Sequence, residues 1–212
     1  MRRSFLIHVL VCTLFFISHL EARPISYAGG WTLMQKNGPT KNTLHIHYSP
    51  KHTYSVGYLT EYFHDNDALT HGLQVNGLLY RANLPDAQGN LYIQSALGTV
   101  HQDHDDEPYG FIGLSGDYET RRIFTHYQNR YYHTKNHLLP SFQENMRIGV
   151  APYIGEFGDL HTWLMLQINH QPGTNEANLI YTPLIRVFQG AYLGELGYAS
   201  NHEWMFNWVI RF

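Results

Sequence analysis

The sequence predicts an all-β fold, a closed antiparallel transmembrane β-barrel of about 12 strands that follows a cleaved signal peptide. Three observations lead to this prediction. Apolar and polar residues alternate along most of the chain, aromatic residues and glycine are abundant (16 Tyr, 11 Phe, 4 Trp and 18 Gly), and mean hydropathy is nevertheless −0.33. Each strand of such a barrel turns half of its residues to lipid and half to a wet interior, which makes an aromatic-rich chain polar on average.

The first 22 residues have the pattern of a secretory signal peptide. Two arginines follow the initiator methionine, a largely apolar stretch covers residues 4–20, and cleavage is expected after Ala22. A single membrane anchor is the alternative interpretation. It is less favoured, because a spanning helix needs about 20 apolar residues and His8 and His19 interrupt this stretch.

Residues 23–212 form one predicted unit, the barrel, since no linker, repeat or low-complexity run interrupts them. The formal net charge of −3 provides no basic field, so we expect no nucleic-acid partner. No apolar run after the signal peptide approaches spanning length, which excludes a helical membrane protein. Cys12 is the single cysteine and lies within the predicted signal peptide, so the mature chain has no thiol chemistry.

The last residues of the chain show the alternation most clearly. One face of the predicted strand is aromatic or apolar, formed by Trp204, Phe206, Trp208, Ile210 and Phe212. This segment resembles the closing strand of bacterial outer-membrane barrels, which typically ends in Phe. The resemblance implies an outer-membrane location, contact with outer-membrane lipids, and recognition of the C-terminal strand by the barrel-assembly machinery.

The same period of two recurs along the rest of the chain. Seven further strands are predicted over residues 54–62, 91–97, 112–118, 148–154, 164–168, 179–187 and 192–198, and four more over residues 30–35, 43–48, 73–81 and 121–132. The total is twelve, an even number as bacterial single-chain barrels require. Ten is the alternative if the stretch near Tyr131 or the first hairpin is not a strand. Pro152 and Pro183 fall inside predicted strands, where we expect bulges or strand ends.

The connections between these strands should alternate between longer outer loops and short inner turns. The predicted outer loops are residues 36–42, 64–70, 101–108, 133–141, 170–177 and 200–202, and the inner turns are residues 49–53, 84–90, 119–120, 155–159 and 189–190. Eight histidines lie in or beside the outer loops: His64, His71, His101, His104, His133, His137, His170 and His202. With the neighbouring carboxylates they suit Zn, Ni or Cu(II). The alternative is that polar loops simply tolerate histidine.

A sharper metal-binding hypothesis concerns His45 and His47. If Leu44 and Ile46 face lipid, both imidazoles face the lumen on neighbouring pleats, with Cα atoms about 6–7 Å apart, and both can reach one ion. Met34 would point inward nearby, and thioether with imidazole is a Cu(I)-type ligand set.

A predicted cross-strand register places small neighbours beside the imidazoles. It pairs His45 with Thr32 and Gly57, and His47 with Gly30 and Ser55. The alternative to a metal site is a polar network in which these histidines bind Glu61 or Ser55.

Two segments in this part of the chain carry a second resemblance. Residues 29–35 (GGWTLMQ) and 44–50 (LHIHYSP) resemble the opening of small proteobacterial outer-membrane proteins that accompany copper-handling proteins. The resemblance implies a metal-related role, with copper or another transition metal as ligand. It supplies no catalytic residues.

No local motif indicates an enzyme, so the sequence favours a non-enzymatic barrel. A small outer-membrane lipid hydrolase or protease is one alternative, although a dyad of His126 with Ser115 or Ser141 rests on assumption alone. A narrow channel or a purely structural barrel is another. A wide pore is not expected, because the predicted inward side chains are large: Phe63, Tyr80, Arg186, Phe188 and Arg211.

Overall fold

The computed structural model describes residues 23–103, 105–156, 158–172 and 179–212. The predicted signal peptide, residues 1–22, lies outside this range. The described residues contain no helix long and apolar enough to cross a membrane. They form twelve strands: β1 (Gly30–Asn37), β2 (Lys41–Lys51), β3 (Tyr54–Phe63), β4 (Ala68–Leu84), β5 (Ala87–Gln102), β6 (Asp105–Thr120), β7 (Ile123–Thr134), β8 (Phe142–Val150), β9 (His161–His170), β10 (Leu179–Gln189), β11 (Tyr192–Tyr198) and β12 (Trp204–Arg211).

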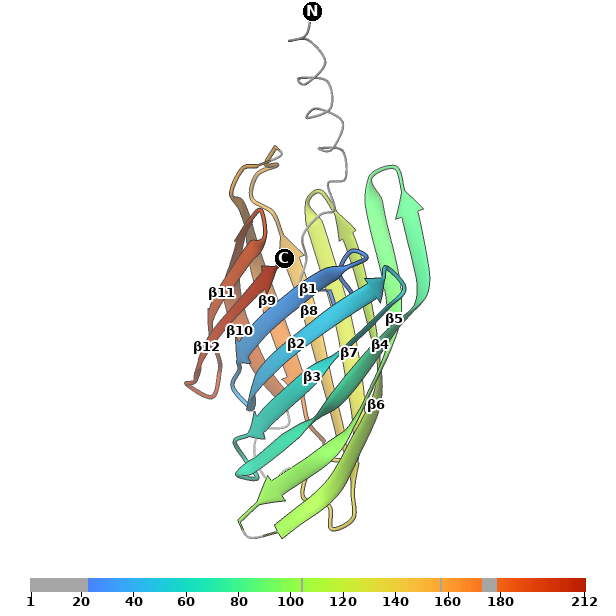
Figure 1. Cartoon of the computed structure of the whole chain (residues 1–212). Coiled ribbons are helices and arrows are strands. Elements are labelled where there is room, and N and C mark those ends of the chain that lie inside the picture. The colour runs from blue at the N-terminus through green and yellow to red at the C-terminus, as the bar shows by residue number, and fades with distance from the viewer. Residues whose placement is uncertain (1–22, 104, 157, 173–178) are drawn as a thin grey trace, which may run out of the picture.

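The twelve strands close into one antiparallel barrel (Figure 1). Each strand pairs with its neighbours in the sequence, and β1 pairs with β12 from Thr32↔Arg211 to Asn37↔Phe206. Both doubtful regions, the first hairpin and the Tyr-rich stretch in β7, are strands. The prediction of twelve strands is therefore confirmed, and the alternative of ten is wrong.

Alternation of side chains gives the barrel an apolar outside and a polar inside. Along β10, for example, exposed Tyr181, Ile185 and Val187 alternate with buried Thr182 and Arg186. Large apolar side chains such as Leu97 (76% exposed) and Trp204 (65%) remain on the outside. A closed sheet with this exterior satisfies every backbone group internally while facing lipid. The chain is thus a β-barrel of the bacterial outer membrane.

The barrel has two distinct ends. We call the end where β1 begins and β12 finishes the terminal end, and the opposite end the far end. All predicted inner turns lie at the terminal end and all predicted outer loops at the far end, as their connectivity requires. Four terminal-end connections have two residues each (52–53, 85–86, 121–122 and 190–191), whereas far-end connections reach eight residues (171–178). The exception is the long terminal-end connection 151–160.

Parts of several predicted outer loops are strand, and the predicted loop 101–108 is largely strand. β4 begins at Ala68, β5 continues to Gln102 and β6 begins at Asp105, and the ends of β5 and β6 lie at the far end of the barrel (Figure 1). β6 begins four residues before Tyr109, where its pairing with β7 ends. The β4–β5 ladder from Leu78 to Leu69 and the β5–β6 ladder run without interruption to the far end. His71, predicted beside an outer loop, and His101, predicted within one, are both strand residues.

Irregularities in the sheet changed one predicted side-chain direction. The β4–β5 register shifts between Leu78 and Tyr80, so Tyr80 is exposed on the outside instead of filling the lumen. Pro152 follows the end of β8, as expected, while Pro183 stays inside β10 without a register shift. Pairing of β10 with β11 begins only at Leu184, so Pro183 lies beside the end of that ladder.

The β4–β5 pair passes through an unusually close approach of two glycines. Gly72 pairs directly with Gly98, and a Cβ atom added to Gly98 would lie 2.5 Å from the Gly72 Cα and 2.0 Å from the His71 carbonyl oxygen. Only residues without a side chain fit this contact. The glycine pair therefore allows the backbones of β4 and β5 to approach more closely than side chains at these two positions would permit.

Apolar side chains fill part of the lumen toward the far end. Phe63, Val100 and Phe111 belong to a buried cluster to which Leu139 also contributes. Leu139 and the neighbouring Leu138 come from the far-end connection between β7 and β8, so this connection folds its leucines against the interior. This part of the lumen is therefore filled by apolar side chains.

Candidate functional site

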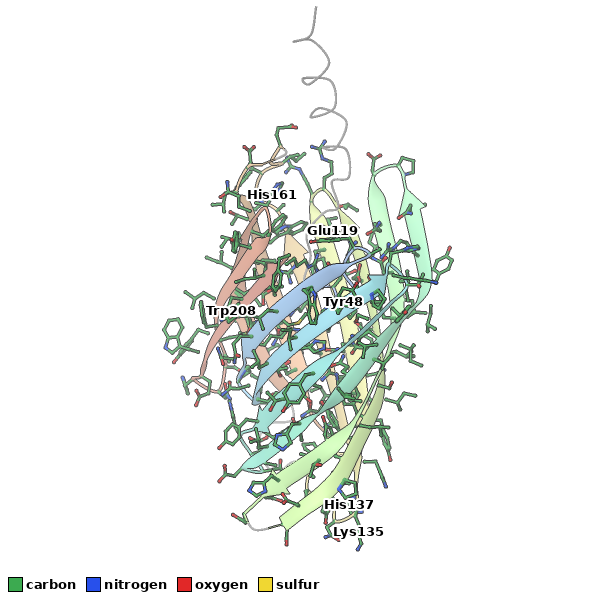
Figure 2. All side chains as sticks on the ribbon, viewed as in Figure 1. Tyr48, Glu119, Lys135, His137, His161 and Trp208 are labelled. Atoms are coloured by element: carbon green, nitrogen blue, oxygen red, sulfur yellow. The ribbon has the colours of Figure 1, made fainter. Side chains whose placement is uncertain are left out.

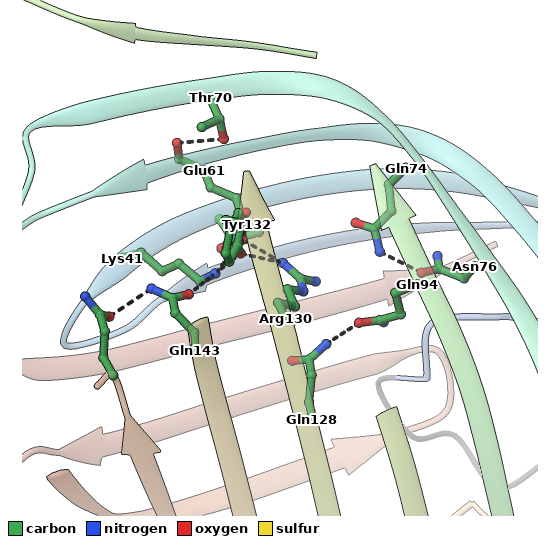
Figure 3. Close-up of polar contacts among 12 residues, drawn as sticks. Lys41, Glu61, Thr70, Gln74, Asn76, Gln94, Gln128, Arg130, Tyr132 and Gln143 are labelled. Carbon is green, nitrogen blue, oxygen red and sulfur yellow. Dashed lines mark hydrogen bonds and ion pairs between the residues drawn. The ribbon is translucent and has the colours of Figure 1, made fainter. Parts of the chain in front are cut away.

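The polar interior contains two buried carboxylates, each held by basic side chains. Glu61 on β3 is 1% exposed. Its carboxylate lies 2.8 Å from Lys41 Nζ and 2.9 Å from Arg130 Nη1, and it accepts a hydrogen bond of 3.0 Å from the Tyr132 hydroxyl (Figure 3). Lys41 also donates to Gln143. Strands β2, β3, β7 and β8 are thereby joined across the lumen.

The second carboxylate, Glu195 on β11, is bound from three directions. Arg147 Nη1 lies 2.9 Å and 3.1 Å from its two oxygens, Arg186 Nε donates at 2.7 Å, and Asn207 Nδ2 donates at 2.6 Å. These donors come from β8, β10 and β12. Both oxygens of the Glu195 carboxylate therefore accept hydrogen bonds from charged or amide donors.

Between these clusters lies a cavity of about 170 Å³ whose charged lining residues are mainly basic. One lining residue, Asp117, is negatively charged, and six are positively charged: Arg23, Lys36, Lys41, Arg130, Arg147 and Arg186. Glu61 and Glu195 form ion pairs with these cations. Together with them, the described residues carry six positive and three negative charges. The middle of the lumen therefore has an excess of positive charge.

This central cavity connects toward both ends of the barrel. Toward the far end it shares Thr40, Lys41, Arg130 and Asn169 with a cavity of about 110 Å³. Toward the terminal end it meets a larger cavity of about 480 Å³ at Arg23. Figure 2 places Glu119 and His161 at the terminal end and Lys135 and His137 at the far end. The three cavities therefore lie one after another along the barrel, and neighbouring cavities share lining residues.

The segment that precedes β1 enters the terminal end of this path. Arg23 donates to Gln88 and pairs with Glu119 at 3.4 Å. The Pro24 carbonyl accepts hydrogen bonds from Ser55 Oγ (2.7 Å) and Asn76 Nδ2 (3.2 Å). Arg23 therefore narrows the junction between the central and terminal-end cavities.

His45, His47 and Met34 all face the lumen, as their parity predicted. His45 and His47 are 4% and 0% exposed, and their ring centroids lie 4.7 Å apart. Met34 is buried and pairs directly with His45 across the β1–β2 ladder. The structure thus brings the three proposed ligands together.

The predicted register around these histidines is wrong by two residues. Thr32 pairs with His47, not His45, and Gly57 also lies opposite His47. His45 lies between Met34 and Leu59 instead of between small residues. The reason is that β1 continues to Asn37 and β2 starts at Lys41, which leaves a turn of three residues.

The far-end histidines do not gather around one point. His101 pairs with Asp106 at 2.5 Å, His170 pairs with Glu144 at 2.6 Å, and the His202 ring packs against Tyr198. His104 lies outside the described residues. Within the part of the chain that the structure describes, no group of three or more His, Cys, Asp or Glu residues has metal-site geometry.

Of the two Ser–His pairs considered in the sequence analysis, Ser115 with His126 is present in the lumen. Ser115 Oγ lies 3.1 Å from His126 Nε2, across the β6–β7 pair. Ser141 stands apart, in the far-end connection between β7 and β8. His126 Nδ1 is buried without a hydrogen-bond partner among the described residues, so no carboxylate orients this ring as in an acid–histidine–serine triad.

Sequence reasoning placed Arg186 in the lumen but missed most of the other basic residues that line the cavity. Lys36, Arg130 and Arg147 were not named as candidate residues, although each lies on the inward face of its strand. Strand parity was the available signal, because Lys36 is two residues from Met34, and the same alternation that points Met34 inward points Lys36 inward.

No protein-family model matches the chain, and no curated protein matches it. Among solved structures, the KdgM porin in complex with disordered oligogalacturonate is similar with a TM-score of 0.49 and 9% sequence identity, covering 86% of this chain and 96% of that chain. The Acinetobacter baumannii outer membrane protein Omp33 is similar with a TM-score of 0.44 and 9% identity, covering 90% of this chain and 99% of that chain. These similarities concern the fold alone.

Proposed function

We propose that this outer-membrane barrel is a narrow passage for small anions. The observation that carries the proposal is the charge of the central cavity, where six basic residues line the wall and three carboxylates offset half of them. Fixed charge of one sign inside a low-dielectric wall raises the local concentration of ions of the opposite sign. Rings of basic side chains are accordingly a means of anion selection in pores.

The path is narrow because side chains and chain segments occupy most of the lumen. Leu139 and Phe63 fill the far-end side, and Arg23 with Pro24 occupies the terminal-end side. The remaining cavities of about 110 and 170 Å³ suit small hydrated ions rather than large solutes. We therefore expect small conductance instead of the large, stable currents of a general diffusion pore.

The direct test is the reversal potential of purified barrel in a planar bilayer under a KCl gradient. Wild type should show small currents, with a reversal potential whose sign indicates preference for chloride over potassium. Lys36→Glu should reduce that preference, because it reverses one charge in the cavity lining, whereas Lys51→Glu, at the exposed end of β2, should leave it nearly unchanged. Absence of conductance, or cation preference in wild type, would contradict the proposal.

A second candidate function is binding of a soft metal ion by His45, His47 and Met34. Buried polar atoms normally have hydrogen-bond partners, but His45 Nε2 and both ring nitrogens of His47 have none among the described residues. Two imidazoles and a thioether suit Cu(I), and imidazole also suits Cu(II) and Zn(II). This supports copper as the favoured ion and a role in copper handling.

The metal proposal is tested by titrating purified barrel with Cu(I), Cu(II) and Zn(II), followed by metal analysis. The His45→Ala, His47→Ala double variant should lose the bound ion. The matched control is a His133→Ala, His137→Ala double variant, which removes two far-end histidines. Unchanged stoichiometry and affinity in the first variant would reject the lumen site, and loss only in the second would move binding to the far end.

A further inference from the structure

Lys36 is a basic residue of the central cavity for which the described residues supply no hydrogen-bond or ion-pair partner. It lies on the inward face of β1, opposite Asn207 of β12, and lines the cavity. Across the described ranges, its ammonium group forms no hydrogen bond or ion pair with another residue. An ammonium group held inside a protein is costly unless a counter-charge or water satisfies its three donors.

Four other cations of the lining already form ion pairs with buried carboxylates. Lys41 and Arg130 hold Glu61, and Arg147 and Arg186 hold Glu195. Each carboxylate thus has two basic partners, and neither is within ion-pair distance of Lys36. The charges of Arg147, Arg130 and Lys41 act on Lys36 along with that of Glu195, so the space around the ammonium is positive on balance.

A further donor faces the same cavity. His126 lines it, and the Nδ1 atom of this ring is buried without a hydrogen-bond partner among the described residues. When the Ser115 hydroxyl donates to Nε2, the proton of the neutral ring is on Nδ1 and is available as a donor. The amide nitrogens of Gln128 and Asn145, in the same lining, already donate to Gln94 and Asn169. The Lys36 ammonium and the His126 ring N–H are thus the donors that fit a ligand with several oxygen acceptors.

We propose that the central cavity is a binding site for a small oxyanion, with Lys36 as its primary ligand. Phosphate, sulfate or a short carboxylate presents several acceptor oxygens to the Lys36 ammonium and the His126 ring N–H, which favours it over a halide. A cavity of about 170 Å³ has room for such an ion with some of its water. The inference rests on the proposed anion passage and names the class of anion that stops inside it.

Calorimetric titration of the detergent-purified barrel with sodium sulfate and with inorganic phosphate tests the site, with sodium chloride as the reference salt. Wild type should bind an oxyanion more tightly than chloride. Lys36→Met should weaken that binding by about tenfold or more, the effect of losing one charge-assisted hydrogen bond. The matched control, Lys51→Met, removes the same charge at the exposed end of β2 and should bind like wild type.

Two conservative variants guard against a folding defect. Lys36→Arg keeps the charge and should retain binding, whereas Lys36→Gln keeps a polar chain and should lose it. Heat-modifiable mobility on gels verifies that each variant is folded. If folded Lys36→Gln or Lys36→Met binds sulfate and phosphate as wild type does, or if wild type binds no oxyanion, the site is rejected.

Bilayer currents separate this inference from the proposed passage. Addition of sulfate should reduce the chloride current of wild type and not that of Lys36→Met. Lys36-dependent binding in a barrel that carries no current would keep the site and reject the passage. Chloride-selective currents without Lys36-dependent binding of an oxyanion would keep the passage and reject the site.

Discussion

The backbones of Trp31 and Phe212 exchange two hydrogen bonds, one of 2.6 Å from the Trp31 amide and one of 3.0 Å from the Phe212 amide. These bonds extend the β1–β12 ladder beyond Thr32↔Arg211 and complete the closure of the barrel at the terminal end. Barrel closure removes the two strand edges that would otherwise expose unpaired backbone groups to lipid.

Deletion of Phe212 should therefore impair assembly, because it removes both bonds and a lipid-facing aromatic ring at once. We propose that the same strand is recognised by the barrel-assembly machinery. The expected result is a reduced heat-modifiable fraction in outer-membrane preparations. Phe212→Leu, which keeps the backbone bonds, should assemble better than the deletion. A deletion variant that accumulates like wild type would refute the assembly role.

Substitution of Glu61 by glutamine should destabilise the barrel by about 3–5 kcal/mol, since it leaves buried cations without their carboxylate. Glu61 is almost fully buried between Lys41 and Arg130. Urea unfolding of barrel refolded into lipid vesicles measures the change. The control is Asp106→Asn, whose partner His101 and own side chain are more than half exposed. That variant should unfold at the wild-type urea concentration; equal shifts in both would contradict the assignment.

Gly98→Ala should distort the β4–β5 pair, because its new Cβ would meet the His71 carbonyl oxygen at 2.0 Å. We expect a loss of about 1–3 kcal/mol, the usual range for overpacking. Gly89→Ala, in the same strand, is the matched control, since its Cβ would meet nothing closer than 3.6 Å. Comparable unfolding curves for the two variants would show that the close approach is not required.

Arg23→Ala should raise the single-channel conductance, because Arg23 lies at the junction of the central and terminal-end cavities. Its removal frees Gln88 and Glu119 from their contacts with the segment that precedes β1. Arg122→Ala removes an exposed arginine from the turn between β6 and β7 and serves as control. Wild-type conductance in Arg23→Ala would show that this segment does not limit the current.

The alternation of inward-facing and outward-facing side chains along a strand is a local property, and the sequence predicted it. Alternation over Trp204, Phe206 and Phe212 predicted the lipid-facing side of β12, and the same rule placed His45 and His47 inside. The number of strands followed from repeating this rule along the chain. Each of these inferences needs only residues within about ten positions of one another.

Tertiary structure alone decided which residues meet. Met34 opposes His45 because the first turn has three residues, a length that the sequence pattern did not fix. Glu61 binds Arg130, 69 positions away, since ring closure brings β3 and β7 to face each other across the lumen. Parity says that a side chain points inward, but the register of every intervening strand determines its level. That Lys36 has no hydrogen-bond or ion-pair partner among the described residues is a consequence of those registers, and no local sequence pattern predicts it.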